Sequence, residues 1–440
     1  MSQSVVRYVL AGVFWMVSAS VQAQSTAPEE PAARQMPQHV VSGLGVYLPP
    51  EPAVRQALLN SPLIDAARAR KQAWISRAQG IAAGPAEFTL RSTGQRRREA
   101  ALGTQMFEST VSVERPLRAW GKRGLDADLA AQTQAYADLE YADTLQQGAR
   151  DLMRFWFAHM RALADQRNAA VAFDLASRLQ RLAQIQFKQG EISQLDRELA
   201  DAEYERVSAA LSVADAQLAS AAAAFARRYP TLTLSNSLSP AFRSEDASVV
   251  SDFQGPMDTA REEFLQKNRE LTMMRSDAQR LRMLADRILR DRLPDPTVGV
   301  FSGRERAGAE TISGVMLSIP LPGAARGYNA SAAVAEAQAA EDRVRLVEQQ
   351  LAAMFEASWL QLQNKRDAAA NLKSAARRQA LAAEKSVKAY SLGEGNLSTV
   401  LLIARQAADN QIAAERMQID TVELAAIIAL DLRRIWDFGD

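Results

Sequence analysis

Histidine, cysteine and acidic side chains are the residues of this sequence that could carry out chemistry. The chain has no cysteine and only two histidines, His39 and His159, which fall in different predicted elements. His159 follows the Phe-Trp-Phe run at 155–157, an environment typical of a histidine packed between helices. No glycine-rich phosphate loop, metal-ligand cluster or nucleophile motif occurs. The sequence therefore predicts a protein that is not an enzyme and has no cofactor and no metal site.

The acidic residues with the most informative spacing follow Gly190. Asp196, Glu198 and Asp201 lie within about three helical turns of that glycine. If several chains brought such carboxylates to one opening, the ring would attract cations and raise the pKa of each carboxyl group. The alternative interpretation is a solvent-exposed helix face. The residues alone leave both open, and the three acids are candidates for a gate.

Gly190 belongs to one of two similar motifs that interrupt helical patterns. The first is Phe-Lys-Gln-Gly-Glu at 187–191, and the second is Tyr-Ser-Leu-Gly-Glu at 390–394. Glycine adopts the left-handed conformation that commonly ends a helix, and serine commonly begins the next one. We therefore expect a tight turn at both places. The principal residues of the two turns are Gly190, Glu191, Ser193, Gly393, Glu394 and Asn396.

A very long helical stretch precedes each turn. Residues 121–188 and 325–391 contain no proline, and apolar residues recur in them at spacings of three and four. At about 1.5 Å per residue each helix would be on the order of 100 Å long, whereas the usual helix has about 11–12 residues. The pattern predicts an apolar seam of the coiled-coil type.

Two short strands precede each long helix. In these segments apolar side chains alternate with polar ones, which predicts a sheet that separates two unlike media. The segments are 86–93, 105–115, 297–302 and 311–319. We interpret 94–104, with three consecutive arginines at 96–98, as a connecting loop. Those arginines could face lipopolysaccharide phosphates or could simply be solvated.

The order of elements occurs twice, so the sequence predicts a tandem duplication. Trp156 and Trp359 occupy matching positions about 200 residues apart. The predicted parts are a signal peptide at 1–23, an extended arm at 24–50, a first repeat at 51–228, a linker at 229–257 and a second repeat at 258–436. Apart from the signal peptide, we expect no stretch that could form a transmembrane helix.

Helix lengths indicate how each repeat packs. A helix of about 30–35 residues before the strands and one of about 35 after the turn together match the long helix between them. Two half-length helices can therefore pack along one full-length helix, with the strands at one end and the glycine turn at the other. The four strands have open edges and need partners, which a barrel closed by several chains would supply.

The bulk composition excludes further classes of function. The 440 residues include 52 basic and 51 acidic side chains. This near-zero net charge argues against nucleic acid as a partner. The absence of cysteine excludes a disulfide framework and a thiolate metal site.

The signal peptide, the duplicated order of helix, two strands, long helix and helix, and the aromatic-x-x-Gly-Glu turns resemble the TolC-like outer membrane factors over residues 51–436. The Pro-Leu pairs at the strand ends, Pro116-Leu and Pro320-Leu, fit the same family. The Trp-Gly-Lys-Arg at 120–123 looks most like the branch that exports heavy-metal cations. The second repeat differs there, with Gly-Ala-Ala-Arg-Gly at 323–327.

The resemblance implies a mainly α protein with a small β part, in which long antiparallel helical hairpins carry four strands. Three chains would form a homotrimer, with a twelve-stranded barrel in the outer membrane of a Gram-negative cell and a helical tunnel in the periplasm. The two glycine turns would dock a periplasmic adaptor protein that couples to an inner-membrane pump. Outer-membrane lipid would be the remaining partner.

In this family, aspartates six and nine residues after the turn glycine can ring the periplasmic entrance. Asp196 has the first spacing, whereas Leu199 has the second, and Thr399 and Leu402 hold both positions in the second repeat. The implied function is a passive, gated conduit of a tripartite efflux system. The alternatives are an outer channel for drug efflux or type I secretion and, in a different class, a pore-less periplasmic coiled-coil adaptor or scaffold.

Overall fold

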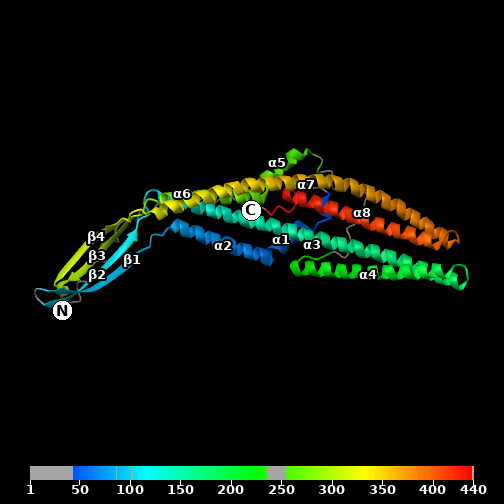
Figure 1. Ribbon diagram of the computed structural model, residues 1–440, viewed down its shortest axis with the longest axis horizontal. Coiled ribbons are helices and arrows are strands. Elements are labelled where there is room, and N and C mark those ends of the chain that lie inside the picture. Colours follow the sequence, from blue (N-terminus) through cyan, green and yellow to red (C-terminus); the bar gives the residue numbers. More distant parts are fainter. Residues whose placement is uncertain (1–42, 86, 101–102, 235–252, 254, 439–440) are drawn as a thin grey trace, which may run out of the picture. The chain divides into compact units, whose positions relative to one another are not determined.

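The protein is described by a computed structural model that covers residues 43–85, 87–100, 103–234, 253 and 255–438. The predicted signal peptide, most of the predicted arm, His39 and much of the predicted linker lie outside the described residues. The described part is mainly α, with one small antiparallel sheet, as the sequence predicts (Figure 1). The helices are α1 Glu51–Leu59, α2 Pro62–Ala83, α3 Lys122–Lys188, α4 Gln194–Arg228, α5 Met257–Lys267, α6 Arg269–Arg290, α7 Ala324–Ser391 and α8 Leu397–Asp431, and the strands are β1 Thr89–Glu99, β2 Thr104–Pro116, β3 Thr297–Glu305 and β4 Glu310–Ser318.

The two long helices, α3 and α7, each carry two shorter helices. The helices α2 and α4 pack along α3, while α6 and α8 pack along α7 (Figure 1). This arrangement confirms the packing inferred from the helix lengths. The helices α6 and α8 also contact α3, so the second half of the chain packs against the first along much of its length.

The helices that precede the strands are each broken, contrary to the single helices expected at 51–82 and 258–291. Between α1 and α2, the Ser61 hydroxyl accepts a hydrogen bond from the backbone N–H of Ile64 at 3.4 Å, and Pro62 opens the new helix. Proline suits this position because its missing N–H would have no partner there. Between α5 and α6, the Asn268 side chain accepts from the backbone N–H of Leu271 at 2.8 Å. Side chains that cap a helix compete with its continuation, which the apolar periodicity does not reveal.

The strands of the first pair are longer than expected, and the arginines at 96–98 lie in β1 and not in a loop. The ladder runs from Thr89 opposite Glu114 to Glu99 opposite Thr104. Arginine has a low preference for strands, but cross-strand pairing decides such positions more than intrinsic preference does. The loop interpretation of 94–104 was therefore wrong, because β1 continues to Glu99 and β2 begins at Thr104.

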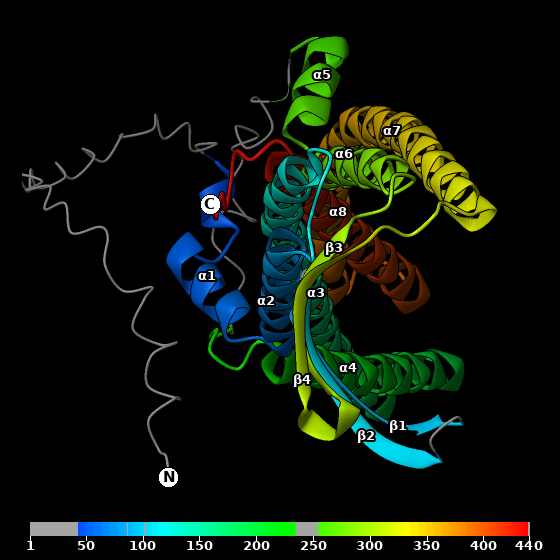
Figure 2. The ribbon, with the colours of Figure 1, turned by 90° about the vertical axis from the view of Figure 1, so that its left-hand side faces the viewer.

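The sheet has the order β1-β2-β3-β4, and all neighbours are antiparallel (Figure 2). Registers place Leu90 opposite Val113, Val113 opposite Val300, and Val300 opposite Val315. These four side chains form one row on one face, because side chains with matched register point to the same side. The strands β2 and β3 join the two halves of the chain into one sheet.

One helix among the described residues, α4, is long and apolar enough to cross a membrane by length and composition. This finding corrects the expectation that no stretch after the signal peptide would be long and apolar enough for a transmembrane helix. A single helix of this kind is weak evidence for a membrane span, because core helices meet the same criteria. In this structure α4 packs along α3.

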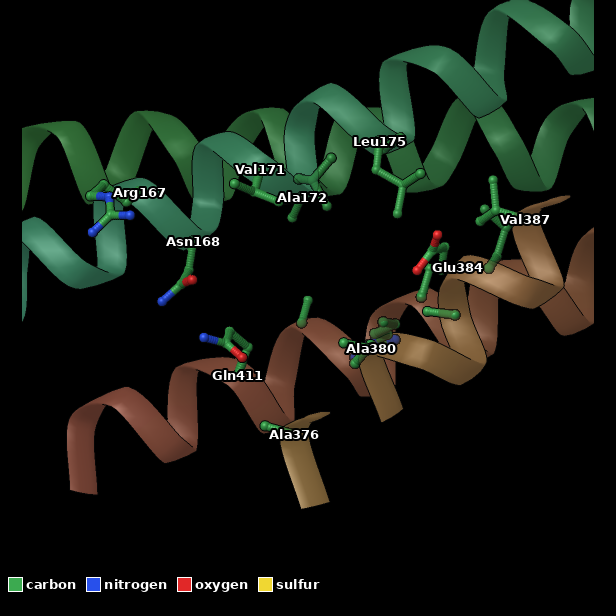
Figure 3. A pocket seen from close by; sticks show the side chains of 18 of the residues that line it. Arg167, Asn168, Val171, Ala172, Leu175, Ala376, Ala380, Glu384, Val387 and Gln411 are labelled. Carbon is green, nitrogen blue, oxygen red and sulfur yellow. The ribbon is translucent and has the colours of Figure 1, made fainter. Parts of the chain in front are cut away.

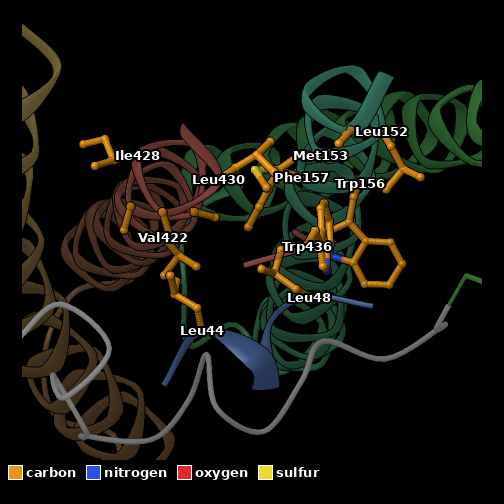
Figure 4. Close-up of a cluster of buried hydrophobic side chains, with 14 of the residues drawn as sticks. Leu44, Leu48, Leu152, Met153, Trp156, Phe157, Val422, Ile428, Leu430 and Trp436 are labelled. Atoms are coloured by element: carbon orange, nitrogen blue, oxygen red, sulfur yellow. The ribbon is translucent and has the colours of Figure 1, made fainter. Parts of the chain in front are cut away.

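The main hydrophobic core includes side chains of α1, α3, α5, α7 and α8, and Figure 4 shows the part between α3 and α8. Phe157 and Trp156 of α3 are buried there, and the Trp156 Nε1–H donates to the backbone oxygen of Tyr47 at 2.9 Å. Trp436, after α8, donates from Nε1 to the backbone oxygen of Pro49 at 3.3 Å. Each buried indole thus finds a polar partner, which avoids the cost of an unpaired donor. His159 is buried on α3, as expected for a packed histidine.

A cluster of charged residues joins the start of α3 to the segment between α6 and β3. Arg118 donates to Asp126 at 2.6 and 2.9 Å, and it also donates to Asp291 and Asp295, both at 2.9 Å. Arg287 of α6 donates to the same Asp126 at 2.7 Å. With Lys122, these residues balance three cations against three anions, and we call the six the junction cluster.

Lys122 is the most buried cation of the junction cluster. Its Nζ donates to the backbone oxygen of Leu293 at 2.5 Å and lies 3.0 Å from Asp295. Next to it, the backbone N–H of Leu117 donates to the backbone oxygen of Pro296 at 2.7 Å. Charge pairing and backbone pairing therefore fix the exit of β2 against the entrance of β3.

The pKa of Asp126 is set by two opposing effects. Burial disfavours its charged form, but hydrogen bonds from Arg118 and Arg287 outweigh burial and hold the pKa below its ordinary value. Because the folded pKa is lowered, the carboxylate contributes stability above the unfolded pKa, and that contribution is lost as the pH falls through the folded pKa.

We predict that Asp126→Asn lowers the stability of the protein. The change leaves Arg118 and Arg287 in a buried site without their shared anion, a loss on the order of 3 kcal/mol. Circular dichroism during heating in detergent should show a midpoint several degrees lower at pH 7, and the gap to the wild type should narrow below about pH 4.

The matched control is Arg306→Gln, which removes an exposed ion pair with Glu310. Such a pair contributes roughly 0–1 kcal/mol, so the midpoint should barely change. Equal effects of Asp126→Asn and Arg306→Gln would show that the junction cluster does not stabilise the fold.

Candidate functional site

The first glycine turn ends α3 with a backbone hydrogen-bond pattern known as a Schellman motif. The N–H of Gly190 donates to the oxygen of Phe187 at 3.0 Å, and the N–H of Glu191 donates to the oxygen of Gln186 at 2.9 Å. Gly190 has φ = 76°, in the left-handed region that favours glycine. The sequence prediction of a glycine-ended helix is confirmed at this position.

The second turn repeats the same motif at the end of α7. Gly393 donates to the oxygen of Tyr390 at 3.0 Å, and Glu394 donates to that of Ala389 at 2.9 Å. Gly393 has φ = 84°. No heavy atom lies within 4 Å of where a Cβ would stand at Gly190 or Gly393. Glycine is therefore required there by the backbone conformation and not by crowding.

Asp196 completes a capping box with Ser193 at the start of α4. The backbone N–H of Asp196 donates to the Ser193 hydroxyl at 3.1 Å, while the hydroxyl donates to the Asp196 carboxylate at 2.7 Å. The Ser-x-x-Asp spacing is the sequence signal for this role, and the sequence reasoning did not use it. At the start of α8, the Asn396 side chain accepts from the backbone N–H of Ser398 at 2.9 Å.

The other two acidic candidates have different surroundings. Glu198 accepts a hydrogen bond from Gln194 of its own helix at 2.7 Å. Asp201 accepts from Gln180 of α3 at 2.8 Å, so its carboxylate is turned toward the neighbouring helix. The structure thus places the three candidates within one stretch of α4. Arg197 lies 3.7 Å from Glu198 and 3.9 Å from Asp201, so these two carboxylates share one cation.

The two hairpin ends are joined to each other. The Tyr390 hydroxyl of α7 donates to the Gln186 side chain of α3 at 2.6 Å. Burial, together with the Asp196 carboxylate, raises the pKa of Tyr390. Around this bond lies a second hydrophobic cluster, which we call the tip cluster and which consists of Leu179, Ala183, Ala200, Tyr390, Leu397 and Val400. Sequence reasoning missed the Tyr390–Gln186 bond because nothing local links residues so far apart along the chain.

A cavity of about 760 Å³ lies between the two hairpins, next to the tip cluster (Figure 3). All four helices α3, α4, α7 and α8 line it, with both apolar and charged side chains such as Val387 and Glu384. On the side away from the tip, Asn168 donates to Glu415 at 2.8 Å. The hairpins therefore separate between two tie points, one at Asn168 and one at Tyr390.

Two further acids are buried in the helices but belong to the packing. Burial raises the pKa of Asp143 to about 6, although its carboxylate accepts a hydrogen bond from Gln147 at 2.6 Å. Asp431, at the end of α8, accepts from Arg150 of α3 at 2.6 and 2.8 Å. Within the described part of the chain, no group of three or more acidic or histidine side chains is placed to hold a metal ion.

Solved structures provide the comparison that bears on this architecture. No family model matches the sequence, and no curated protein sequence matches it. The outer membrane channel CmeC of Campylobacter jejuni superposes with a TM-score of 0.71 over 87% of this chain and 85% of that one, at 13% identity. The chain has the fold of an outer membrane channel.

Other solved structures agree. The outer membrane protein VceC of Vibrio cholerae gives a TM-score of 0.68 at 16% identity, over 86% of this chain and 95% of that one. The MtrE outer membrane channel of Neisseria gonorrhoeae gives a TM-score of 0.61 at 14% identity, over 87% of this chain and 88% of that one. The resemblance to the TolC-like factors inferred from the sequence is thus confirmed for the fold. Structural similarity at identities this low shows the fold alone.

Proposed function

We propose that this protein is the outer-membrane channel of a tripartite efflux system in a Gram-negative cell. It would act as a passive conduit without enzymatic chemistry, and a homotrimer would form the working channel. The observation that carries the proposal is the exposed apolar face of the four-stranded sheet, on a chain with the fold of outer membrane channels. The exposed apolar residues of this face are Phe88, Leu90, Phe107, Val111, Val113, Val298, Val300, Val315 and Leu317.

The height of this apolar face suits a lipid bilayer. On β2 and its extension the same face runs from Leu117 to Phe107, both exposed. At about 3.4 Å per residue this is about 34 Å along the strand, and a strand tilt of about 40° reduces it to about 26 Å. The apolar band of outer-membrane barrels is about 25 Å tall. In water such a band would be costly to leave exposed.

On β1 and β2 the opposite face of the sheet is largely polar and suits a water-filled lumen. Glu108 and Ser112 are buried on it. Arg97 forms an ion pair with Glu108 at 3.3 Å, and Arg91 forms one with Glu114 at 3.6 Å. A sheet that is apolar on one side and carries paired charges on the other has the pattern of a barrel with lipid outside and water inside.

A trimer follows from the number of strands. Four strands leave β1 and β4 as open edges, and a barrel needs about eight strands to enclose even a packed interior. Three copies would pair β4 of one chain with β1 of the next and close twelve strands. In lipid only a closed sheet satisfies all its backbone groups.

The glycine turns and their neighbours are proposed to dock a periplasmic adaptor. Support comes from the duplicated Schellman motifs and from the tip cluster, which holds both turns in one packed unit. Glu191, Ser193, Glu394 and Asn396 complete this surface. A rigid end with a fixed backbone suits recognition by a second protein.

The substrate class that we propose is divalent heavy-metal cations. The Gly-Lys-Arg at 121–123 favours heavy-metal cations by family resemblance. However, Lys122 is buried in the junction cluster, so its packing accounts for it without a metal substrate. Divalent heavy-metal cations remain our proposal, with drugs or secreted proteins as alternatives. A pore-less periplasmic adaptor is disfavoured by the exposed apolar band.

We predict that the protein purifies as a trimer that inserts into lipid. Chemical crosslinking in mild detergent should give a product of three chains. Val300→Arg places a charge in the apolar band and should reduce insertion, because an arginine near the bilayer centre costs about 2–4 kcal/mol.

The control is Thr93→Arg, on the exposed part of the polar face, which should leave insertion nearly unchanged. Only monomers and dimers after crosslinking would overturn the trimer. A protein that is extracted from cells without detergent would be the pore-less scaffold of the alternative.

We predict that the double variant Gly190→Val/Gly393→Val loses efflux but still inserts. Valine in the left-handed conformation costs at least about 1–2 kcal/mol at each turn, and the strain falls at the proposed docking surface. The matched control is Gly124→Val/Gly327→Val, at two helical glycines that also have no heavy atom near a Cβ. Efflux assays in cells should separate the two, and normal efflux with both valines in the turns would refute docking there.

Asp196 is proposed to line the periplasmic entrance of the trimer in addition to capping α4. Asp196→Ala should weaken block of single-channel current by multivalent cations added from the periplasmic side, because it removes the ring of carboxylates. Ser193→Ala also removes the capping box but keeps the charge, so it should leave the block intact. Equal effects of the two changes would mean that Asp196 serves only as a cap. Unchanged block would exclude this ring, and Glu198→Ala and Asp201→Ala would then test the remaining candidates.

A further inference from the structure

Three arginines share the apolar face of the sheet, at the end farthest from the long helices. Strand alternation places Arg96 and Arg98 of β1 on the same side as Leu90, and register places Arg304 of β3 on that side too, opposite Ser109. All three side chains are exposed. They come from both halves of the chain, so only the assembled sheet brings them to one surface.

The three arginines surround the last aromatic residue of the apolar band. Phe107 stands opposite Arg96, and it is 60% exposed on this face. Arg98 lies one step farther along, opposite Gln105, and Arg304 lies one step closer to the band. The face thus changes from mainly apolar to strongly basic over about two rows of side chains, with a spacing of roughly 7 Å between rows.

These arginines differ from the arginines on the other face in their partners. Arg91 and Arg97 on the polar face are held in ion pairs with Glu114 and Glu108. Within the described residues, the side chains of Arg96, Arg98 and Arg304 make no hydrogen bond or ion pair. The face with the apolar band therefore carries three unneutralised charges at one end.

We propose that Arg96, Arg98 and Arg304 bind the phosphate groups of a phosphorylated glycolipid in the outer leaflet of the membrane. The inference rests on the proposed function, which places the apolar band in lipid and the long helices in the periplasm. The basic end of the band then meets the outer leaflet. Guanidinium groups bind phosphate with two parallel hydrogen bonds, and such bonds strengthen at a poorly hydrated interface.

The geometry favours lipid phosphate over other anions. The arginines border exposed Phe107, which can pack against acyl chains while the guanidinium groups reach the headgroup. A soluble anion would gain nothing from that aromatic neighbour. In the described residues this face carries no carboxylate, whereas on the polar face Glu114 and Glu108 pair with Arg91 and Arg97.

The test measures binding of lipid A to the purified trimer in nanodiscs of phosphatidylcholine. The probes are lipid A with both phosphates and the same lipid after enzymatic removal of its phosphates. The wild type should prefer the phosphorylated probe, and Arg96→Gln/Arg98→Gln should weaken its binding roughly tenfold or more. The double variant Arg91→Gln/Arg97→Gln removes the same charge from the same strand on the other face and should change binding less than about twofold.

Further controls distinguish binding of a lipid phosphate from binding of a free anion. Inorganic phosphate at the same concentration should not displace the lipid, and displacement would mean that the arginines form a site for a free anion. If Arg96→Gln/Arg98→Gln does not insert into the nanodisc, the variant Arg96→Lys/Arg98→Lys serves instead, because it keeps the charge. It should bind phosphorylated lipid A with intermediate affinity, since lysine cannot form two parallel hydrogen bonds to a phosphate. The inference would be overturned if Arg96→Gln/Arg98→Gln and Arg91→Gln/Arg97→Gln weakened lipid binding equally. It would also be overturned if the wild type showed no preference for phosphorylated lipid. Insertion into phosphatidylcholine alone tests the proposed function separately.

Discussion

The bonds between Asp126 and two arginines, Arg118 and Arg287, hold the helical and β parts of this protein together. Asp126 lies on α3, Arg118 follows β2, and Arg287 belongs to α6, so one buried carboxylate joins three elements from both halves of the chain. Its side chain is only 2% exposed. An unpaired charge there would cost several kcal/mol, so the three elements keep their positions relative to one another. This constraint holds the exit of β2 next to the segment that enters β3, where the two strands pair.

The same junction shows how the two copies of a duplicated plan have diverged. Lys122, at the start of α3, binds the segment between α6 and β3 at the backbone oxygen of Leu293. Arg326, at the start of α7, binds the same segment at the backbone oxygen of Asp291, at 2.6 Å. The start of each long helix thus supplies one cation to one connecting segment. Asp126 corresponds to buried Ala330 in the second copy, so only the first copy supplies this carboxylate, although Arg287 of the second copy binds it.

At the far end of the long helices the physical problem is different. There the chain must reverse direction twice, and glycine supplies the left-handed conformation at low cost. The hydroxyl of Tyr390 then ties the two reversals together, while the hairpins stay apart over the cavity behind them. A packed end with a hollow behind it allows small shifts in hairpin spacing without the loss of the turns themselves. This combination suits the adaptor docking that we propose for this end.

The sequence by itself determined the elements that depend on local periodicity and local chemistry. The lengths of α3 and α7, their glycine ends and the presence of four alternating strands could all be read from residue spacing, because a helix or strand repeats its pattern every few residues. Ser193 was predicted to begin α4, whereas the part of Asp196 in the capping box was not. The breaks at Ser61 and Asn268 also had local signals, but the apolar periodicity favoured continuous helices.

Only the tertiary structure decided which distant residues meet. The pairing of Arg96 with Phe107 extended β1 through a run of arginines, because a partner strand supplies hydrogen bonds that intrinsic preference does not. The turn of Asp201 toward Gln180, the bond between Tyr390 and Gln186 and the bridge of Asp126 to Arg287 join separate elements. Such contacts depend on the rotation of each helix about its axis, which packing fixes and a single sequence does not express.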